Sequence, residues 1–109
     1  MLDHDGNFMD AAALGAIAAL WNTTMKDGEK LPVSKKPIAN TFVKIAGKIL
    51  LDPSLAEERV MEARLTVTTD ELGNIVAMQK AAPGFWSPEE VMECVKIAMR
   101  KGKELRKLL

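Results

Sequence analysis

The segment Asp3-His4-Asp5 is the first candidate for chemistry, because it sets two carboxylates beside the only histidine of the chain. Carboxylate and imidazole groups bind metal ions and transfer protons. In an extended chain, however, residues two apart share one side, so both carboxylates point away from the imidazole. A metal site needs three or four converging ligands, which this segment does not supply alone. We interpret it as the solvated flank of a turn.

Glu57, Glu58 and Glu62 form a second candidate, since carboxylates are the ligands that Mg²⁺ takes. Acidic residues at the start of a short helix also favour the positive end of its dipole, and we prefer this interpretation. Cys94 has no histidine near it in the sequence to activate it. It lies beside the apolar side of a predicted helix, which indicates a buried, unreactive thiol.

A basic C-terminal segment carries more information than these clusters. Acidic residues open the last predicted helix and basic residues close it, which complements the helix dipole; contact with RNA phosphates or with an acidic partner is the alternative. In the loop before this helix, Phe85 and Trp86 have rings that could stack on a base, but we expect them to close the edge of the core. The segment opposes one acid, Glu104, with Lys96, Arg100, Lys101, Lys103, Arg106 and Lys107.

The elements that must position these side chains alternate between helix and strand patterns. Alternation is clearest at 62–69, where Ala63, Leu65 and Val67 share one side. The string Ser87-Pro88-Glu89-Glu90 is a capping box with proline at the first helical position. In order, we predict a helix capped by Asp10 and ending near Asn22, a linker over 23–37, strands at 38–46 and 48–52, a helical turn at 54–61, strands at 62–69 and 75–80, and a helix after Ser87.

This order predicts an α+β fold, a four-stranded antiparallel sheet with two helices on one face, in one domain over residues 1–109. The first helix is apolar on nearly every side, so it needs burial on more than one side. Asp5-Gly6-Asn7 is a turn signal with little chain before it for a strand. We therefore expect the chain to be one half of a larger domain, or a module whose edge another chain completes.

Composition excludes several classes of protein. Fifteen basic residues balance fifteen acidic ones, which argues against a strongly basic nucleic-acid-binding chain. Hydrophobic residues make up 48% of the chain, which argues against disorder. The single cysteine excludes an internal disulfide and favours a reducing compartment. No apolar run reaches the length of a membrane span.

Several strings, taken together and in order, resemble the RNase PH family, and more narrowly the non-catalytic RNase PH-type subunit of the archaeal exosome. No single string is decisive, but the joint match covers essentially the whole chain. The strings are Leu2-Asp3-His4-Asp5-Gly6-Asn7, Asp10-Ala11-Ala12, Leu20-Trp21-Asn22, Leu31-Pro32-Val33, Lys36-Pro37-Ile38, Thr41-Phe42-Val43-Lys44-Ile45, Leu51-Asp52-Pro53, Ala63-Arg64-Leu65-Thr66, Ala77-Met78-Gln79-Lys80 and Lys101-Gly102-Lys103-Glu104-Leu105.

The resemblance implies the C-terminal half of an RNase PH-type domain, with the fold called ribosomal protein S5 domain 2-like. In this family, catalytic and non-catalytic subunits alternate in a hexameric ring around a channel. RNA is degraded from its 3′ end, with inorganic phosphate as the nucleophile and co-substrate. The implied partners are the catalytic subunit, the RNA-binding cap subunits and RNA. The resemblance implies no cofactor bound by this chain, no membrane, and a cytoplasmic location.

One departure from the family pattern defines the expected role. Catalytic relatives have Glu-Ala-Asp where this chain has Glu62-Ala63-Arg64. An aspartate there can act as an acid or hold a cation, whereas a guanidinium stays charged and only donates hydrogen bonds. We therefore expect no catalytic residues, and we predict RNA contacts at Arg64, Lys101 and Lys103. For Arg64, an ion pair with an acid across the subunit interface and a plain surface position on the strand remain alternatives.

Two other classes remain open at this point. The first is an autonomous α+β protein-interaction module without an RNA role, which assembly with a catalytic subunit would exclude. The second is a small metal-dependent hydrolase that uses Asp3, His4 and Glu62, which stoichiometric metal binding would support.

Overall fold

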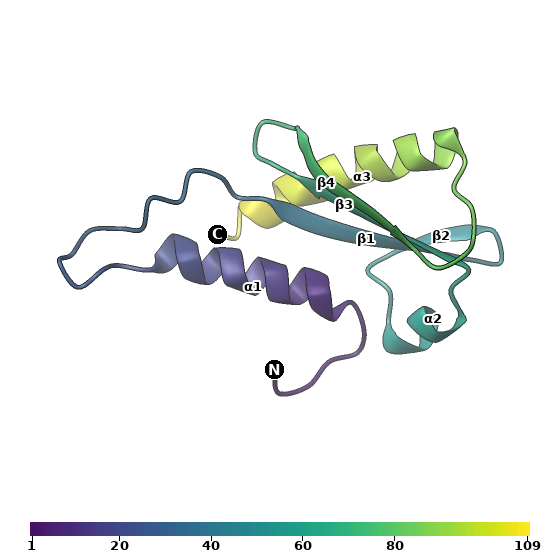
Figure 1. The fold of residues 1–109 in the computed structure, drawn as a ribbon, viewed down its shortest axis with the longest axis horizontal. Helices are drawn as coiled ribbons and strands as arrows, with labels where there is room; N and C mark the ends of the chain where they lie inside the picture. The colour runs from purple at the N-terminus through teal and green to yellow at the C-terminus, as the bar shows by residue number, and fades with distance from the viewer.

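The computed structural model describes residues 1–109 and contains three helices and one sheet (Figure 1). The four strands are all antiparallel and lie in the order β2-β1-β3-β4. The predicted α+β class and four-stranded antiparallel sheet are therefore confirmed. The elements are α1 (Phe8–Asn22), β1 (Ile38–Ile45), β2 (Lys48–Leu51), α2 (Leu55–Val60), β3 (Ala63–Thr69), β4 (Ile75–Ala81) and α3 (Pro88–Arg106).

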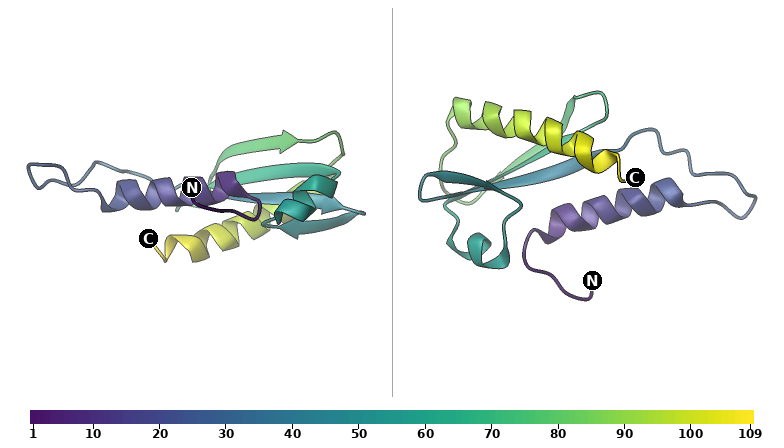
Figure 2. Two further views of the ribbon diagram at one scale, coloured as in Figure 1. Left: turned by 90° about the horizontal axis from the view of Figure 1, so that it is seen from below. Right: turned by 180° about the vertical axis from the view of Figure 1, so that it is seen from behind.

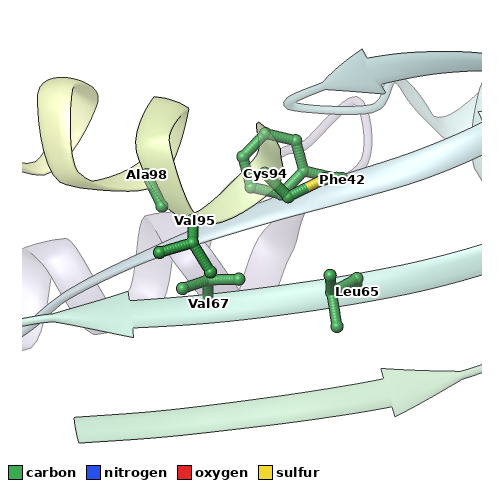
Figure 3. Packing of buried hydrophobic residues seen from close by; sticks show 6 residues of the cluster. All are labelled: Phe42, Leu65, Val67, Cys94, Val95 and Ala98. Carbon is green, nitrogen blue, oxygen red and sulfur yellow. The ribbon is translucent and has the colours of Figure 1, made fainter. Parts of the chain in front are cut away.

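The core lies between α3 and one face of β1 and β3. Burial alternates strictly along β3, as the sequence pattern predicts, and Leu65 pairs directly with Phe42 of β1. Figure 3 shows side chains of α3 pointing toward these two strands. Burying such apolar side chains is the main favourable contribution to folding. The six buried members of this cluster are Phe42, Leu65, Val67, Cys94, Val95 and Ala98.

A local sequence signal defines the start of α3, and long-range contacts hold its end. The Ser87 hydroxyl accepts the Glu90 amide at 3.1 Å and the Glu90 carboxylate accepts the Ser87 amide at 3.0 Å, which completes the predicted capping box. At the other end, the Arg106 guanidinium donates to the Lys36 carbonyl at 2.8 Å and to the Thr69 hydroxyl at 2.9 Å. These contacts join the helix end to the linker and to β3.

Helices α1 and α3 do not share a face of the sheet, so the predicted placement of two helices on one face is wrong. Phe42 faces α3, whereas its neighbour Thr41 points the other way and donates to Asp10 of α1 at 2.9 Å. Both side chains are fully buried. Figure 2 shows α3 crossing the strands, while α1 runs beside β1 without crossing them. Residues on both faces of β1 are buried, so other parts of the chain must pack on each of its faces.

Helix α1 also begins earlier than predicted. Its N-cap is Asn7, in the left-handed region with φ 46°, and Asp10 lies inside the first turn. Asn7 takes this position because long-range contacts hold it: its backbone amide donates to Glu58 at 2.7 Å and its side chain donates to Asp52 at 2.7 Å. Gly6 packs so closely on α2 that an added Cβ would lie 2.5 Å from the Leu55 nitrogen.

A large part of the apolar surface stays uncovered. Only Ile17 of α1 is buried, although that helix is apolar on nearly every side, and all seven residues of β4 are exposed. The radius of gyration is 15.4 Å, whereas a compact chain of this length has about 13 Å. The predicted need of α1 for more cover is therefore unmet within these residues.

Candidate functional site

Arg64 lies in the middle of the sheet, on the face that α1 approaches. It pairs with Val43 on one side and Ala81 on the other, so its side chain leaves the face opposite α3. A cavity of about 340 Å³ opens there, between the first turns of α1 and the strands β3 and β4. The residues around it are Met9, Asp10, Ala13, Ala39, Arg64, Thr66, Gln79 and Ala81.

The polar groups of this cavity favour anion binding over proton transfer. The Arg64 guanidinium makes no hydrogen bond or ion pair within the chain, so its planar set of donors is free. The nearby carboxylate of Asp10 already accepts from Thr41 and, at 3.1 Å, from the Asn7 amide. The Thr66 hydroxyl shares a hydrogen bond of 2.8 Å with Thr41. A free guanidinium recognises phosphate or carboxylate through paired hydrogen bonds.

The other two predicted RNA-contact residues lie on α3 and do not join Arg64. The Lys101 ammonium pairs with Glu104 at 2.8 Å and borders a separate cavity of about 410 Å³ between α1 and α3. Lys103 is exposed and has no partner within the chain. Because α3 covers the face opposite Arg64, these residues form two surfaces and no single site.

The clusters with metal-binding or acid–base character stay apart. The His4 imidazole accepts the Gly6 amide at 3.1 Å, the Asp3 carboxylate accepts the His4 amide, and Glu62 accepts the Ala46 amide at 2.7 Å. No three His, Cys, Asp or Glu side chains are arranged to hold a metal ion. The structure thus gives no support to the hydrolase that was proposed on Asp3, His4 and Glu62.

Cys94 is buried in the core, and burial raises the pKa of its thiol to about 11, with smaller contributions from Glu93 and Glu90. A thiol with so high a pKa is protonated at neutral pH and is a poor nucleophile. The prediction of a buried Cys94 is confirmed.

The two aromatic residues before α3 have separate environments. Trp86 packs against the core cluster, as expected, and the Lys44 ammonium lies 4.9 Å from its ring centroid. Phe85 is 87% exposed, which differs from the expectation that both rings close the core edge. The Lys44 ammonium donates to the Phe85 carbonyl at 2.5 Å, so the exposed ring stands on a tethered loop.

Sequence reasoning missed the contacts of Asn7 with Asp52 and Glu58, which are 45 and 51 residues away. The short-range signal present in the sequence, the three-residue spacing of Asn7 and Asp10, accounts for only one of the contacts of Asn7.

The helices α1, α2 and α3 include no candidate for a membrane-spanning segment.

Comparison with known proteins agrees with this fold. Residues 36–101 match the profile of the 3′ exoribonuclease family, domain 2, so the chain belongs to this family as that domain. Among curated relatives, Exosome complex component Rrp42 of Pyrococcus furiosus is 45% identical over 100% of this chain and 45% of the relative. The same component of Thermococcus kodakarensis is 46% identical over 97% of this chain and 44% of the relative. The chain therefore spans less than half the length of these relatives.

Solved structures agree with the fold. A chain of the Archaeoglobus fulgidus exosome with RNA bound to the active site superimposes with a TM-score of 0.86 and 38% identity, over 97% of this chain and 44% of that one. An archaeal exosome core has the same TM-score and identity, over 97% of this chain and 46% of that one. Rice Rrp46, at 16% identity and a TM-score of 0.75, shows the shared fold only.

Proposed function

We propose that this chain forms part of a non-catalytic RNase PH-type subunit of an exosome ring, and that it shapes the path of RNA while a catalytic partner subunit degrades the strand. The observation that carries the proposal is Arg64, a guanidinium without a partner in the chain that lines a cavity on the face opposite α3. The resemblance to the RNase PH family implies an aspartate at this position in catalytic relatives. The similarity to archaeal Rrp42 along the whole chain supports the assignment to that kind of subunit.

In the proposed assembly, the reaction takes place in the catalytic partner subunit, and this chain helps to position the RNA. At the partner's site, an oxygen of inorganic phosphate attacks the phosphorus of the last phosphodiester, and the bond to the 3′ oxygen of the preceding nucleotide breaks. A nucleoside diphosphate leaves, and the shortened RNA keeps a 3′ hydroxyl. Arg64 has no proton to exchange at neutral pH, so it positions an RNA phosphate and catalyses no step.

Further features of the proposal follow from the same assignment. The chain binds no cofactor, and inorganic phosphate is a substrate of the complex. The catalytic subunit and the RNA-binding cap subunits are its protein partners, and the cytoplasm is its place of work. The uncovered apolar surfaces of α1 and β4 are consistent with a subunit that buries them against further protein.

Mixing with the catalytic RNase PH-type subunit tests the assignment, with ring formation measured by light scattering. We expect a ring of alternating subunits that releases nucleoside diphosphates, and no release by this chain alone. If the chain never co-assembles and never contacts RNA, the autonomous interaction module is the correct function. If it releases nucleoside diphosphates alone, the non-catalytic role is wrong.

The role of Arg64 is tested in the reconstituted ring with Arg64→Ala, with Arg59→Ala as the matched control because Arg59 is exposed and unpaired. Loss of a charge-assisted contact to a phosphate weakens RNA binding by about 2 kcal/mol, which is ~30-fold. Arg64→Lys recovers part of this loss. If Arg64→Ala instead weakens only ring assembly, the guanidinium contacts a carboxylate of the neighbouring subunit and not RNA.

A further inference from the structure

Four basic residues form one line along the exposed side of α3. Lys96, Arg100, Lys103 and Lys107 follow one another at intervals of four, three and four residues, which brings them to one side of a helix. All four are exposed. We call these four residues the α3 basic stripe. At the rise of an α-helix it is about 16 Å long.

The cations of the α3 basic stripe have no anionic partner within the chain. The three salt bridges involve Lys35, Lys44 and Lys101, and the only other hydrogen-bonded cations are those of Lys80 and Arg106. Acidic side chains lie near both ends of the stripe, Glu89 and Glu93 in one hollow with Lys96, and Asp70 and Glu71 in another with Lys103 and Lys107. None of them forms a salt bridge with a residue of the stripe.

Stabilisation of the helix does not account for the stripe. Favourable interaction of cations with the helix dipole decays within the last turn. Helix α3 ends at Arg106, so Lys103 and Lys107 benefit, whereas Lys96 and Arg100 lie too far from that end. The stripe also acts on its neighbour Glu104, whose pKa is lowered first by the hydrogen bond from Lys101 and further by the nearby Arg100 and Lys107 charges.

The chemistry of the stripe fits a phosphate backbone better than a protein. Protein interfaces are depleted in lysine and contain a buried apolar centre. Here three of four residues are lysine, and the apolar side chains beside them are scattered and form no buried centre: Met92, the half-buried Met99, Leu108, and Leu72 of the β3–β4 hairpin. The Cβ atoms of residues one helical turn apart lie about 5–6 Å apart, so these four long side chains can each reach a different phosphate of a single strand.

We propose that the α3 basic stripe is an RNA-backbone contact of this protein, separate from Arg64 and independent of base sequence. The two surfaces lie on opposite faces of the sheet, since α3 packs on the face with Phe42 and Arg64 leaves the other face. The stripe holds the backbone of a single strand by charge, outside the cavity. The proposal deepens the proposed function, on whose RNA role it rests, but its readout is RNA binding by this chain and needs neither ring assembly nor phosphorolysis.

The test measures binding of a fluorescent single-stranded oligouridylate to the purified protein by anisotropy, over a series of salt concentrations. Neutralising all four residues of the stripe to glutamine removes up to four phosphate contacts. We expect affinity to fall ~10-fold or more at moderate salt, and the slope of log K against log salt to fall by about 3. A matched control removes four other exposed, unpaired cations and leaves affinity within about twofold; it combines Lys26→Gln, Lys30→Gln, Lys48→Gln and Arg59→Gln.

Further arms keep the result decisive. A charge-preserving variant with Lys96→Arg, Lys103→Arg and Lys107→Arg binds as the parent does, which attributes the loss in the glutamine variant to charge. Equal losses in the stripe and control variants would overturn the proposal, because binding would then depend on net charge alone. Displacement of the RNA by polyglutamate at equal charge would overturn it too, in favour of an acidic protein partner. Light scattering with the catalytic subunit reports ring assembly separately, and the stripe variant assembles normally.

Discussion

The hydroxyl of Thr41 donates to the carboxylate of Asp10 at 2.9 Å, and this contact joins α1 to the face of the sheet on which Arg64 lies. Thr41 is fully buried, and its hydroxyl also meets Thr66 of β3. The same Asp10 carboxylate accepts from the side chain of Asn7. A single carboxylate therefore positions the first turn of α1, one wall of the Arg64 cavity, relative to two strands.

Replacing Asp10 with alanine is expected to lower the free energy of unfolding by about 1–3 kcal/mol. The change leaves the Thr41 hydroxyl and the Asn7 amide without their acceptor, and a hydrogen bond to a charged group is stronger than a neutral one. Urea denaturation measures the loss. Glu93→Ala on α3 removes the same charge from an exposed, unpaired position and serves as the control. Equal effects of the two substitutions would show that the contact does not stabilise α1.

Two helical glycines are expected to respond to alanine in opposite directions. A Cβ at Gly15 meets nothing within 4 Å, so Gly15→Ala gains helix propensity and raises the free energy of unfolding by about 1 kcal/mol. A Cβ at Gly102 would lie 2.7 Å from the Thr69 hydroxyl. Gly102→Ala therefore pushes α3 away from β3 and lowers the free energy of unfolding by about 1–3 kcal/mol. Thermal or urea denaturation of both variants measures these changes. If both substitutions stabilise the protein, α3 does not pack closely on β3 at Gly102.

The loss of stability at acidic pH is expected to depend on Asp70. Hydrogen bonds from Asn74, then from the Leu72 amide and the Lys35 ammonium, lower the pKa of this carboxyl from 3.8 to about 2. A lowered pKa means that the ionised form stabilises the fold above pH 4, and that this contribution is lost as the pH falls toward 2. The urea midpoint, measured between pH 5 and 2, reports it.

The matched variant for this prediction is Asp70→Asn, which cannot lose a charge in that range. We expect it to be less stable at neutral pH and to show a flatter decline below pH 4 than the parent protein. Glu71, Glu90 and Glu104 also have a lowered pKa, so a shallow decline remains in the variant. An unchanged profile would show that Asp70 gains nothing from its partners in the hairpin.

The uncovered surfaces predict self-association of this chain in isolation. Leu20 of α1 is 48% exposed, and Val76 and Met78 of the edge strand β4 are 46% and 45% exposed. Unpaired strand edges and apolar patches promote association between chains. Sedimentation velocity at rising concentration should show species larger than a monomer, and Met78→Lys should reduce them. A well-behaved monomer at all concentrations would contradict the prediction.

Much of the fold could be predicted because the deciding signals are short-range. The capping box of Ser87 and Glu90 places the start of α3, and that of Ser54 and Glu57 places α2. Gly73, with φ 81°, supplies the left-handed position of the β3–β4 hairpin. Each of these signals acts within a few residues, where the chain's own covalent geometry limits the alternatives.

The placement of the helices, and the separation of the predicted RNA-contact residues into two surfaces, could not be predicted in this way. Asp10 has the side chain of a good N-cap, yet Asn7 caps α1 because Asp52 and Glu58 hold it in place. Arg64 and Lys103 carry the same charge, and nothing near them in sequence shows that α3 and the Arg64 cavity lie on opposite faces.

The sequence by itself determined the order of the elements, the buried side of β3, the starts of α2 and α3, and the absence of an acid at position 64. These follow from periodicity, capping and residue identity, which are local properties of the chain. Only the tertiary structure decided that α1 runs beside β1 with its first turn on the face opposite α3, and that the α3 basic stripe is unpaired and separate from Arg64. Such facts depend on contacts between residues far apart in sequence, whose geometry exists only once the sheet has formed.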